Sequence, residues 1–292
     1  GAVLAQAIGS SVKEGLIAKN PSEHRRHLVA ASTGPEFFAV AMAKRTPIVG
    51  GNWKSNPERR EDAERLIVAF NEMEPEKVET VIFPSALHIQ MARSNLKETI
   101  AVGAQNTSKT RCGAFTGELS AEMLKDIGCQ WTLIGHSERR HVFGETVEDT
   151  VTKVERTLES GVGVIFCVGE LLEEREAGRT VEVCEQQLGP ALPKVTDWSK
   201  FVIAYEPVWA IGTGVVATKD QAQEAHRAVR EFVREKCGDA AADAVRMQYG
   251  GSVTPDNCAG LIGQPDIDGF LVGGASLKPT FTKIVETVAS SF

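Results

Sequence analysis

Residues 201–214 read F-V-I-A-Y-E-P-V-W-A-I-G-T-G, and the order of residue types in this stretch points to the fold. Phe201–Tyr205 is a short apolar run with the length of a buried strand, and it stops at a carboxylate, Glu206. Pro207 and a loop with two glycines follow. The segment Lys219–Cys237 then places its charges on one face, as an amphipathic helix does. This stretch therefore predicts a buried strand, a polar loop and a covering helix.

The same unit recurs along the chain from Thr46 onward. Eight apolar runs end in glycine or polar residues, and helical patterns such as Val147–Glu159 separate them. The runs are Pro47–Gly51, Val78–Phe83, Thr99–Ala104, Gln130–Ile134, Val162–Val168, Phe201–Tyr205, Val245–Tyr249 and Ile267–Val272. Uniformly apolar strands that alternate with helices imply a parallel sheet that is covered on both faces or closed on itself. Eight units in residues 46–292 predict an α/β fold of the (β/α)8 TIM barrel type, which needs about 250 residues.

An open doubly wound sheet is the alternative fold. Such a sheet usually carries a G-x-G-x-x-G turn after its first strand, where a dinucleotide phosphate binds. The nearest match, Gly161-Val162-Gly163, lacks the third glycine. The barrel is therefore favoured, and a dinucleotide cofactor is not expected.

The composition excludes several classes of function. The formal net charge of −7 argues against nucleic acid as the main partner, because phosphate backbones need a basic surface. No apolar run approaches the roughly 20 residues that span a bilayer, so no membrane insertion is expected. The six cysteines lie far apart, which indicates reduced thiols in a reducing compartment. His136 and His141 are five residues apart and fall on different faces of a helix, so a metal site is not expected.

Residues 1–45 do not join the strand–helix rhythm and are predicted to form an extension to a single barrel domain, residues 46–292. They carry six Lys or Arg against three acids, a net +3, so residues 46–292 carry −10 of the total of −7. A leader that is poor in acids and contains Arg and Ser resembles an organelle transit segment. We therefore expect the matrix of a plastid or mitochondrion. The alternative is a lineage-specific extension on a cytoplasmic protein.

Reactive side chains cluster where the predicted strands end. In a barrel these ends form one face, which carries the active site. Glu206 alone would usually be a solvated loop acid, but Trp209 and Ile211 are expected to shield it, and a desolvated carboxylate is a stronger base. His136 is expected to donate a neutral imidazole N–H to a carbonyl oxygen as charge develops there. Lys54 is expected to supply positive charge to an anionic substrate.

Two neighbours complete this predicted acid–base set. Asn52 follows the first apolar run, two residues before Lys54, and is expected at the same rim. Glu138 is the expected ion-pair partner that holds the Lys54 side chain in place.

Glycine pairs at the last two strands predict an anion site. Gly250-Gly251-Ser252 follows the seventh run and Gly273-Gly274 follows the eighth, where barrels often bind phosphate through main-chain N–H groups. The segment from Pro207 to Gly214 is expected to act as a lid that excludes water. Gly212 is expected to add one more N–H to the phosphate when the lid closes.

Five motifs, in order along the chain, resemble those of the triosephosphate isomerase family. They are Gly51–Lys54, Gly113–Glu118, Ile134–Arg140, Ala204–Gly214 and Tyr249–Ser252. The resemblance spans residues 46–292. It implies the reversible conversion of dihydroxyacetone phosphate and glyceraldehyde 3-phosphate, a step of glycolysis and gluconeogenesis, without cofactor or metal.

The resemblance also implies roles for individual residues. Glu206 would move the proton between the two carbons, and His136 would polarise the carbonyl and protonate the enediolate oxygens. Lys54 and Asn52 would bind the anionic substrate and neutralise its charge. The family is itself the standard worked case of a carboxylate base, a neutral histidine and a closing loop, so these roles are carried over. The residues carried over as supporting ones are Ser137, Glu138, Cys167, Trp209 and Tyr249.

The resemblance further implies a homodimer. The family inserts the loop that is residues 106–118 here into the neighbouring subunit, and Gln105 and Thr116 lie on that contact. Two positions depart from the family pattern. Val215 replaces a common lysine at a lid hinge and is followed by Val216, and this β-branched pair stiffens the hinge. Ser55 stands where relatives carry bulkier or thiol side chains at the dimer contact.

Two other functions remain open at this stage. A lyase or synthase acting on another sugar phosphate would keep the glycine pairs but would need a different acid–base set, usually with a lysine inside a strand. A barrel that has lost catalysis would also keep the fold, but it should have lost at least one of Glu206, His136 and Lys54.

Overall fold

The computed structural model describes residues 45–74, 76–211 and 216–292. Within these residues eight parallel strands pair in sequence order and close on themselves, because β1 pairs with both β2 and β8. The strands are β1 Ile48–Asn52, β2 Glu79–Phe83, β3 Ile100–Ala104, β4 Trp131–Ile134, β5 Gly163–Val168, β6 Phe201–Tyr205, β7 Arg246–Tyr249 and β8 Gly269–Val272. Each predicted apolar run coincides with one strand to within two residues, so the (β/α)8 TIM barrel is confirmed.

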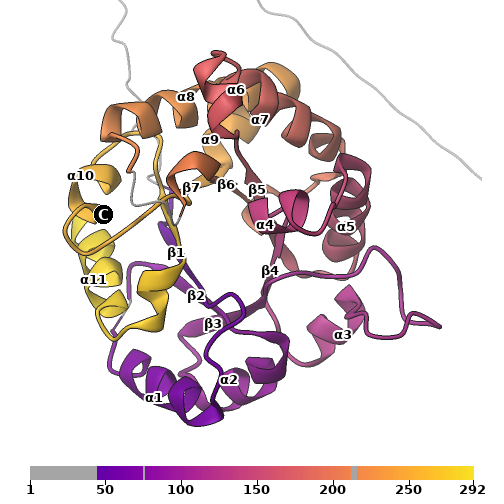
Figure 1. The fold of residues 1–292 in the computed structure, drawn as a ribbon, viewed down its shortest axis with the longest axis vertical. Helices are drawn as coiled ribbons and strands as arrows, with labels where there is room; N and C mark the ends of the chain where they lie inside the picture. The colour runs from indigo at the N-terminus through magenta and orange to yellow at the C-terminus, as the bar shows by residue number, and fades with distance from the viewer. Residues whose placement is uncertain (1–44, 75, 212–215) are drawn as a thin grey trace, which may run out of the picture. The chain divides into compact units, whose positions relative to one another are not determined.

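Helices surround this barrel, as Figure 1 shows. The α-helices are α1 Arg60–Phe70, α2 Ile89–Asn95, α3 Ala121–Asp126, α4 Ser137–His141, α5 Val147–Glu159, α6 Leu172–Glu176, α7 Thr180–Leu188, α8 Lys219–Cys237, α9 Asp239–Ala244, α10 Cys258–Ile262 and α11 Phe281–Ser291. Short 3-10 turns are η1 Ala86–His88, η2 Gly189–Lys194, η3 Trp198–Lys200, η4 Val208–Ala210 and η5 Gly274–Leu277. The two helices predicted from charge patterning, α5 and α8, have the predicted bounds, and both begin with a threonine capping box, at Thr146 and Thr218.

Two apolar clusters stabilise the barrel. The larger cluster lies between the strands and the helices, and the smaller one is made only of strand residues and fills the interior. Glycines admit the largest interior side chains. A Cβ on Gly103 would lie 2.3 Å from the Phe83 ring, and one on Gly163 would lie 2.5 Å from the Trp131 ring. Glycine at these strand positions therefore permits a packed interior, which holds the strand ends rigidly.

No helix in the described part of the chain has both the length and the apolar character that crossing a bilayer requires. The predicted extension, residues 1–45, lies outside the described residues apart from Arg45. That arginine binds the barrel, because its Nε donates to Asp268 Oδ1 at 2.7 Å. Val215 of the predicted hinge and Gly212 of the predicted lid also lie outside the described residues. Val216 is described and is half exposed.

Candidate active site

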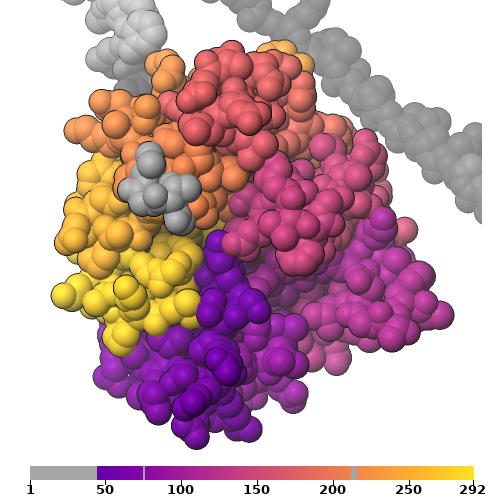
Figure 2. All heavy atoms as spheres, in the orientation of Figure 1, coloured from indigo at the N-terminus to yellow at the C-terminus, as the bar shows by residue number. Residues whose placement is uncertain are grey.

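A cavity of about 370 Å³ opens at the carboxyl ends of the strands. Figure 2 shows the segments around it, from the indigo start of the barrel to its yellow end, meeting near the middle of this face. The cavity is lined by Asn52, Lys54, His136, Glu206, Ile211, Gly250, Gly251, Ser252, Val253, Thr254, Leu271, Gly273, Gly274, Ala275 and Lys278. The structure thus brings together all four predicted catalytic residues with the predicted Ser252 and the Gly273-Gly274 pair.

The carboxylate of Glu206 is held by main chain and histidine. Its side chain is almost completely buried, with a residue exposure of 2%. Oε2 accepts the Ser137 N–H at 3.0 Å, and Oε1 lies 3.1 Å from His136 Nε2. The backbone N–H of Glu206 also continues the β5–β6 ladder by donating to Val168 at 2.7 Å. The carboxylate is thus fixed in orientation at the cavity, which is the geometry that a general base needs.

Two glycines make room for Glu206. A Cβ on Gly250 would come within 2.9 Å of the Glu206 Cγ. A Cβ on Gly169 would meet the Glu206 carbonyl oxygen at 1.7 Å, far inside any allowed contact. Gly250, which sequence analysis assigned to the anion site, therefore also has a steric role beside the predicted base.

The imidazole of His136 accepts a hydrogen bond from the main chain. His136 is the N-cap of α4, and its Nδ1 accepts the Glu138 N–H at 3.2 Å. A nitrogen that accepts cannot carry the hydrogen of a neutral ring, so the hydrogen is assigned to Nε2, which faces Glu206 and the cavity. Residue exposure of His136 is only 6%. This geometry supplies the neutral N–H donor that sequence analysis expected at this rim.

Lys54 lies in a strained backbone conformation. Its φ of 55° is the only positive φ of a non-glycine residue in the described ranges, and such a conformation costs of order 1–3 kcal/mol. Asn52 Oδ1 accepts the Lys54 N–H at 3.0 Å, and Gln105 Nε2 donates to the Lys54 carbonyl at 2.7 Å. Two polar side chains thus offset the strain and hold the lysine at the rim.

The side chain of Lys54 is also fixed. Nζ lies 2.5 Å from Glu138 Oε1, the ion-pair partner expected from sequence, with the two side chains 26% and 46% exposed. A partly solvated pair of this kind adds little to stability. Its consequence is orientation, since it holds the ammonium group at the cavity wall.

The predicted phosphate cradle is an open surface of main chain. Gly273 and Gly274 line the cavity and introduce the 3-10 turn η5. A Cβ on Gly274 would meet no atom within 4 Å, so nothing within the chain demands glycine there. Ser252 Oγ donates to the Ala210 carbonyl at 2.8 Å, which ties the cradle to the loop after β6.

Trp209 and Ile211, the two residues expected to shield Glu206, have different surroundings. The Trp209 indole N–H donates to Glu170 Oε1 at 2.9 Å, and Ile211 lines the cavity. Glu170 is completely buried at the end of β5 and also accepts the Tyr205 hydroxyl at 3.0 Å. Arg175 lies 4.8 Å from the Trp209 ring. The loop after β6 is thereby attached to the end of β5 through a buried acid, Glu170, which was not among the predicted site residues.

The remaining supporting residues lie around this centre. The Cys167 thiol is fully buried against Glu206, and burial followed by the Glu206 charge raises its pKa well above the usual range. Tyr249 is buried beneath the cradle, where a Cβ on Gly251 would lie 2.2 Å from its hydroxyl; burial raises the Tyr249 pKa to about 12. Both side chains are buried, so neither is an exposed nucleophile.

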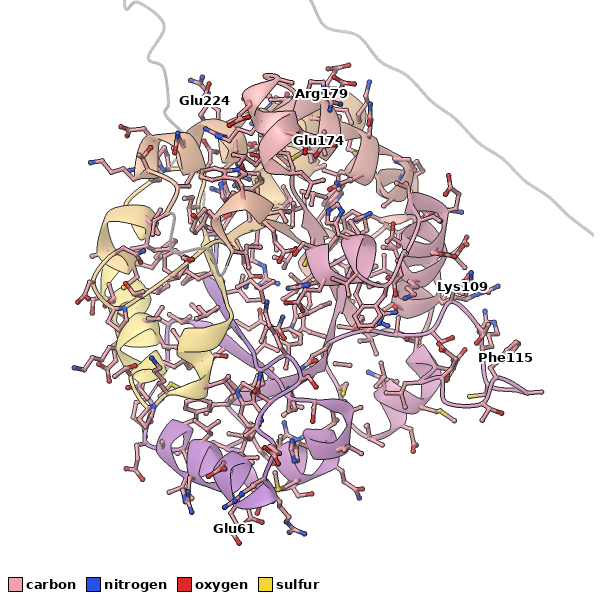
Figure 3. The ribbon with its side chains drawn as sticks, in the orientation of Figure 1. Glu61, Lys109, Phe115, Glu174, Arg179 and Glu224 are labelled. Carbon is pink, nitrogen blue, oxygen red and sulfur yellow. The ribbon has the colours of Figure 1, made fainter. Side chains whose placement is uncertain are left out.

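The structure describes one chain, so the dimer residues are placed only within it. Gln105 hydrogen-bonds inside the chain to the Lys54 and Phe83 carbonyls. Thr116 is exposed on the loop between β3 and α3, which Figure 3 shows reaching away from the barrel with Lys109 and Phe115 labelled on it. In the described ranges no group of three or more His, Cys, Asp or Glu side chains is arranged to hold a metal ion.

Comparison with known proteins gives consistent matches. The family model described as triosephosphate isomerase matches residues 47–288. A curated relative named "Triosephosphate isomerase, chloroplastic", from Secale cereale, is 48% identical over 267 residues, which cover 91% of this chain and 86% of the relative. That share of the chain exceeds what residues 46–292 make up, so the match extends into the residues before the barrel.

Proposed function

The chain belongs to the triosephosphate isomerase family, and from this premise we propose that its cavity isomerises dihydroxyacetone phosphate and D-glyceraldehyde 3-phosphate through an enediolate. The observation that carries the mechanism is the contact of 3.1 Å between Glu206 Oε1 and His136 Nε2 at the cavity. A base and a neutral N–H donor converge there on one place. A substrate in the cavity that contacts both side chains would have its carbon proton at the base and its carbonyl oxygen at the donor.

The proposed reaction is a transfer of one proton between two carbons. Glu206 takes the proton from C1 of dihydroxyacetone phosphate, and the electrons of that C–H bond form the C1–C2 double bond. The carbonyl electrons move to O2, where the negative charge is stabilised by the His136 N–H and by the Lys54 charge. Return of the proton from Glu206 to C2, with transfer of the hydroxyl proton from O1 to O2, gives the aldehyde. No electron acceptor is consumed, so the balance needs no redox cofactor.

The phosphate is proposed to bind at the glycine cradle. Gly273 and Gly274 present main chain at the cavity, Ser252 is adjacent, and Lys54 adds a positive charge. Gly212 is proposed to contribute an N–H from the loop after β6. This anchoring holds the reacting carbons in a fixed position relative to Glu206, so the proton transfer avoids the entropy cost of bringing the two groups together.

The alternative sugar-phosphate lyase is disfavoured by one observation. None of the eight described strands contains a lysine, so the described barrel has no mid-strand amine for a Schiff base. The proposed function is tested by running the reaction in deuterium oxide and following products by NMR. Deuterium on C2 of the aldehyde supports the enediolate, because the proton that Glu206 holds exchanges with solvent before a proton is returned to carbon. Product that carries only the original hydrogen would argue for a direct hydride shift, and no product at all would refute the activity.

We propose that the chain acts as a homodimer through the loop after β3. The support is the exposed apolar surface of this loop, where Phe115 is 48% exposed, together with exposed Phe143 after α4. Thr116 and Gln105 are proposed to lie at the contact. Light scattering during size exclusion should give twice the chain mass of 31.5 kDa. A single-chain mass at working concentration would refute the dimer.

We also propose that residues 1–45 direct the chain to the plastid. Their acid-poor composition and the chloroplastic name of the relative that matches part of them support this location. Fusion of residues 1–45 to a fluorescent reporter in plant cells should give plastid fluorescence. Fluorescence in the cytoplasm or the mitochondria would refute it.

A further inference from the structure

Arg140 is a partly buried arginine with an unusual set of partners. It lies in α4, four residues after His136. Its Nε donates to the Gly135 carbonyl at 2.7 Å, and its Nη2 donates to the Cys167 carbonyl at 3.0 Å. The guanidinium also lies 5.6 Å from the Phe166 ring centre. All of these contacts are to neutral groups.

The two carbonyls that Arg140 joins are the next rung of the barrel. The β4–β5 pairing ends at Ile134 opposite Phe166, so Gly135 stands where Cys167 would be its partner. The strands separate at this point, and the fork of the guanidinium bridges them instead of a main-chain hydrogen bond. Gly135 is fitted to this arrangement. Its φ is +73°, and a Cβ there would lie 2.3 Å from Arg140 Nη2.

Both ends of this bridge lead directly to the reacting groups. Gly135 is followed by His136, whose Nε2 faces Glu206. Cys167 carries the thiol that packs against the Glu206 carboxylate. A shift of either carbonyl would therefore move one member of the His136–Glu206 pair relative to the other.

The charge of Arg140 has no close counterion. The neighbouring Arg139 pairs with Glu145 at 2.6 Å, but Arg140 makes no ion pair with any residue in the described ranges 45–74, 76–211 and 216–292. Burial lowers the Arg140 pKa, and the nearby Cys167 and Glu206 groups oppose that effect. The Arg140 guanidinium and the Glu206 carboxylate are therefore opposite charges that attract each other across the rim.

We propose that Arg140 is a positioning residue of the isomerase, which fixes His136 and Glu206 through the ends of β4 and β5 and places a positive charge near the base. This inference rests on the proposed function. The inference predicts one effect that a purely structural role would not produce. Loss of the Arg140 charge should change the pH at which the base becomes protonated.

The groups around Glu206 define what that pH profile reports. The charged and titratable side chains that face it are His136 and Arg140 from the β4–α4 segment, Cys167 from β5, and the Lys54–Glu138 pair at the rim, whereas β7 contributes Gly250. Only Arg140 is changed in the test. A shift of the acid limb in its variants therefore reports the Arg140 charge.

The experiment measures kcat and kcat/KM between about pH 5 and 9 for wild type, Arg140→Met and Arg140→Lys. In Arg140→Met we expect kcat at neutral pH to fall by about tenfold or more, because the pair loses its alignment. The acid limb of kcat/KM should move up by about half a pH unit or more, because a nearby opposite charge favours the carboxylate. Arg140→Lys keeps the charge and loses the fork, so it should keep the wild-type acid limb with a lowered kcat.

Two controls separate this role from general damage. Arg230→Met removes a buried arginine that donates to three carbonyls, those of Ala242, Val245 and Asp266, and that also pairs with the Asp266 and Asp268 carboxylates, away from the cavity. It should lower the unfolding temperature without moving the acid limb. Competitive inhibition by inorganic phosphate should keep its wild-type constant in the Arg140 variants, because the glycine cradle is not touched.

An acid limb at the wild-type position in Arg140→Met would overturn the proposal, whatever happens to kcat. If that variant does not fold, Arg140→Lys decides, and a wild-type kcat for it would overturn the positioning role. The proposed function is tested separately, because it would be refuted by a wild-type protein that lacks isomerase activity, whatever the Arg140 variants do.

Discussion

Replacing Gly250 with alanine tests how tightly the fold holds the predicted base. The added Cβ would lie 2.9 Å from the Glu206 Cγ and 3.2 Å from the Tyr205 carbonyl oxygen, whereas ordinary contacts begin at 3.4 Å. The carbonyl belongs to a strand and cannot retreat, so the Glu206 side chain must move by roughly 0.5–1 Å. Because a displacement of about 1 Å at a reacting group costs about a hundredfold, we expect kcat/KM to fall by roughly 10- to 100-fold, or about 1.4–2.7 kcal/mol.

The free energy of unfolding should fall by a similar amount, but the protein should remain folded. Overpacking by one methyl group costs about 1–3 kcal/mol, which leaves most of the protein folded. The assay couples glyceraldehyde 3-phosphate formation to a dehydrogenase, with thermal unfolding measured on the same samples. A kcat/KM within twofold of wild type, in a folded Gly250→Ala protein, would refute the reasoning that Gly250 sets the position of Glu206.

Three further outcomes follow from other parts of the structure. Gly274→Ala adds a Cβ that meets no protein atom within 4 Å, so the fold should be unchanged, while KM and the phosphate inhibition constant should rise by about tenfold because the methyl group clashes with the bound anion. Gly260→Ala on α10, where a Cβ also meets no atom within 4 Å, is the control. Equal kinetics in both variants would contradict phosphate binding at the glycine cradle. Burial lowers the pKa of His226 from 6.5, so the folded state binds fewer protons than the unfolded state, and stability is lost as pH falls below about 6.5. In His226→Phe the unfolding temperature should therefore depend less on pH between about 7.5 and 5.5. An unchanged dependence would assign the loss of stability to other groups. Iodoacetamide at about pH 8 should modify exposed Cys237 well before buried Cys167, whose raised pKa leaves little thiolate, and mass spectrometry that finds both labelled at one rate would contradict the burial.

Much of the fold was predictable because the buried positions of strands and helices appear in the sequence as regular patterns of apolar residues. Phe201–Tyr205 is apolar throughout since both faces of a barrel strand are covered, and α8 keeps its charges on the exposed face except for the buried Arg230. Once the strand order is known, the ends of the strands must share one rim. This is why Glu206, His136, Lys54 and Asn52 could be predicted as neighbours from positions far apart in the chain.

Contacts made by side chains with the main chain were not predictable. Arg140 donates to two carbonyls, and a sequence pattern gives no sign of which carbonyls a given arginine meets. The same holds for Lys54, since no residue type announces a φ of 55° outside glycine. Gly250 was interpreted as an anion-binding glycine, but its distance from Glu206 depends on how β6 and β7 pair. Tertiary geometry decided each of these cases.

The most direct test of the central claim is the isomerisation rate of Glu206→Asp against wild type. Loss of one methylene withdraws the carboxylate from its contacts at 3.0 Å with the Ser137 N–H and 3.1 Å with His136 Nε2, with little change in charge or burial. Wild type should approach the diffusional range of about 10⁸ M⁻¹s⁻¹ in kcat/KM. The account predicts that kcat of folded Glu206→Asp falls by at least about a hundredfold, and equal rates for the two proteins would contradict the assignment of Glu206 as the base.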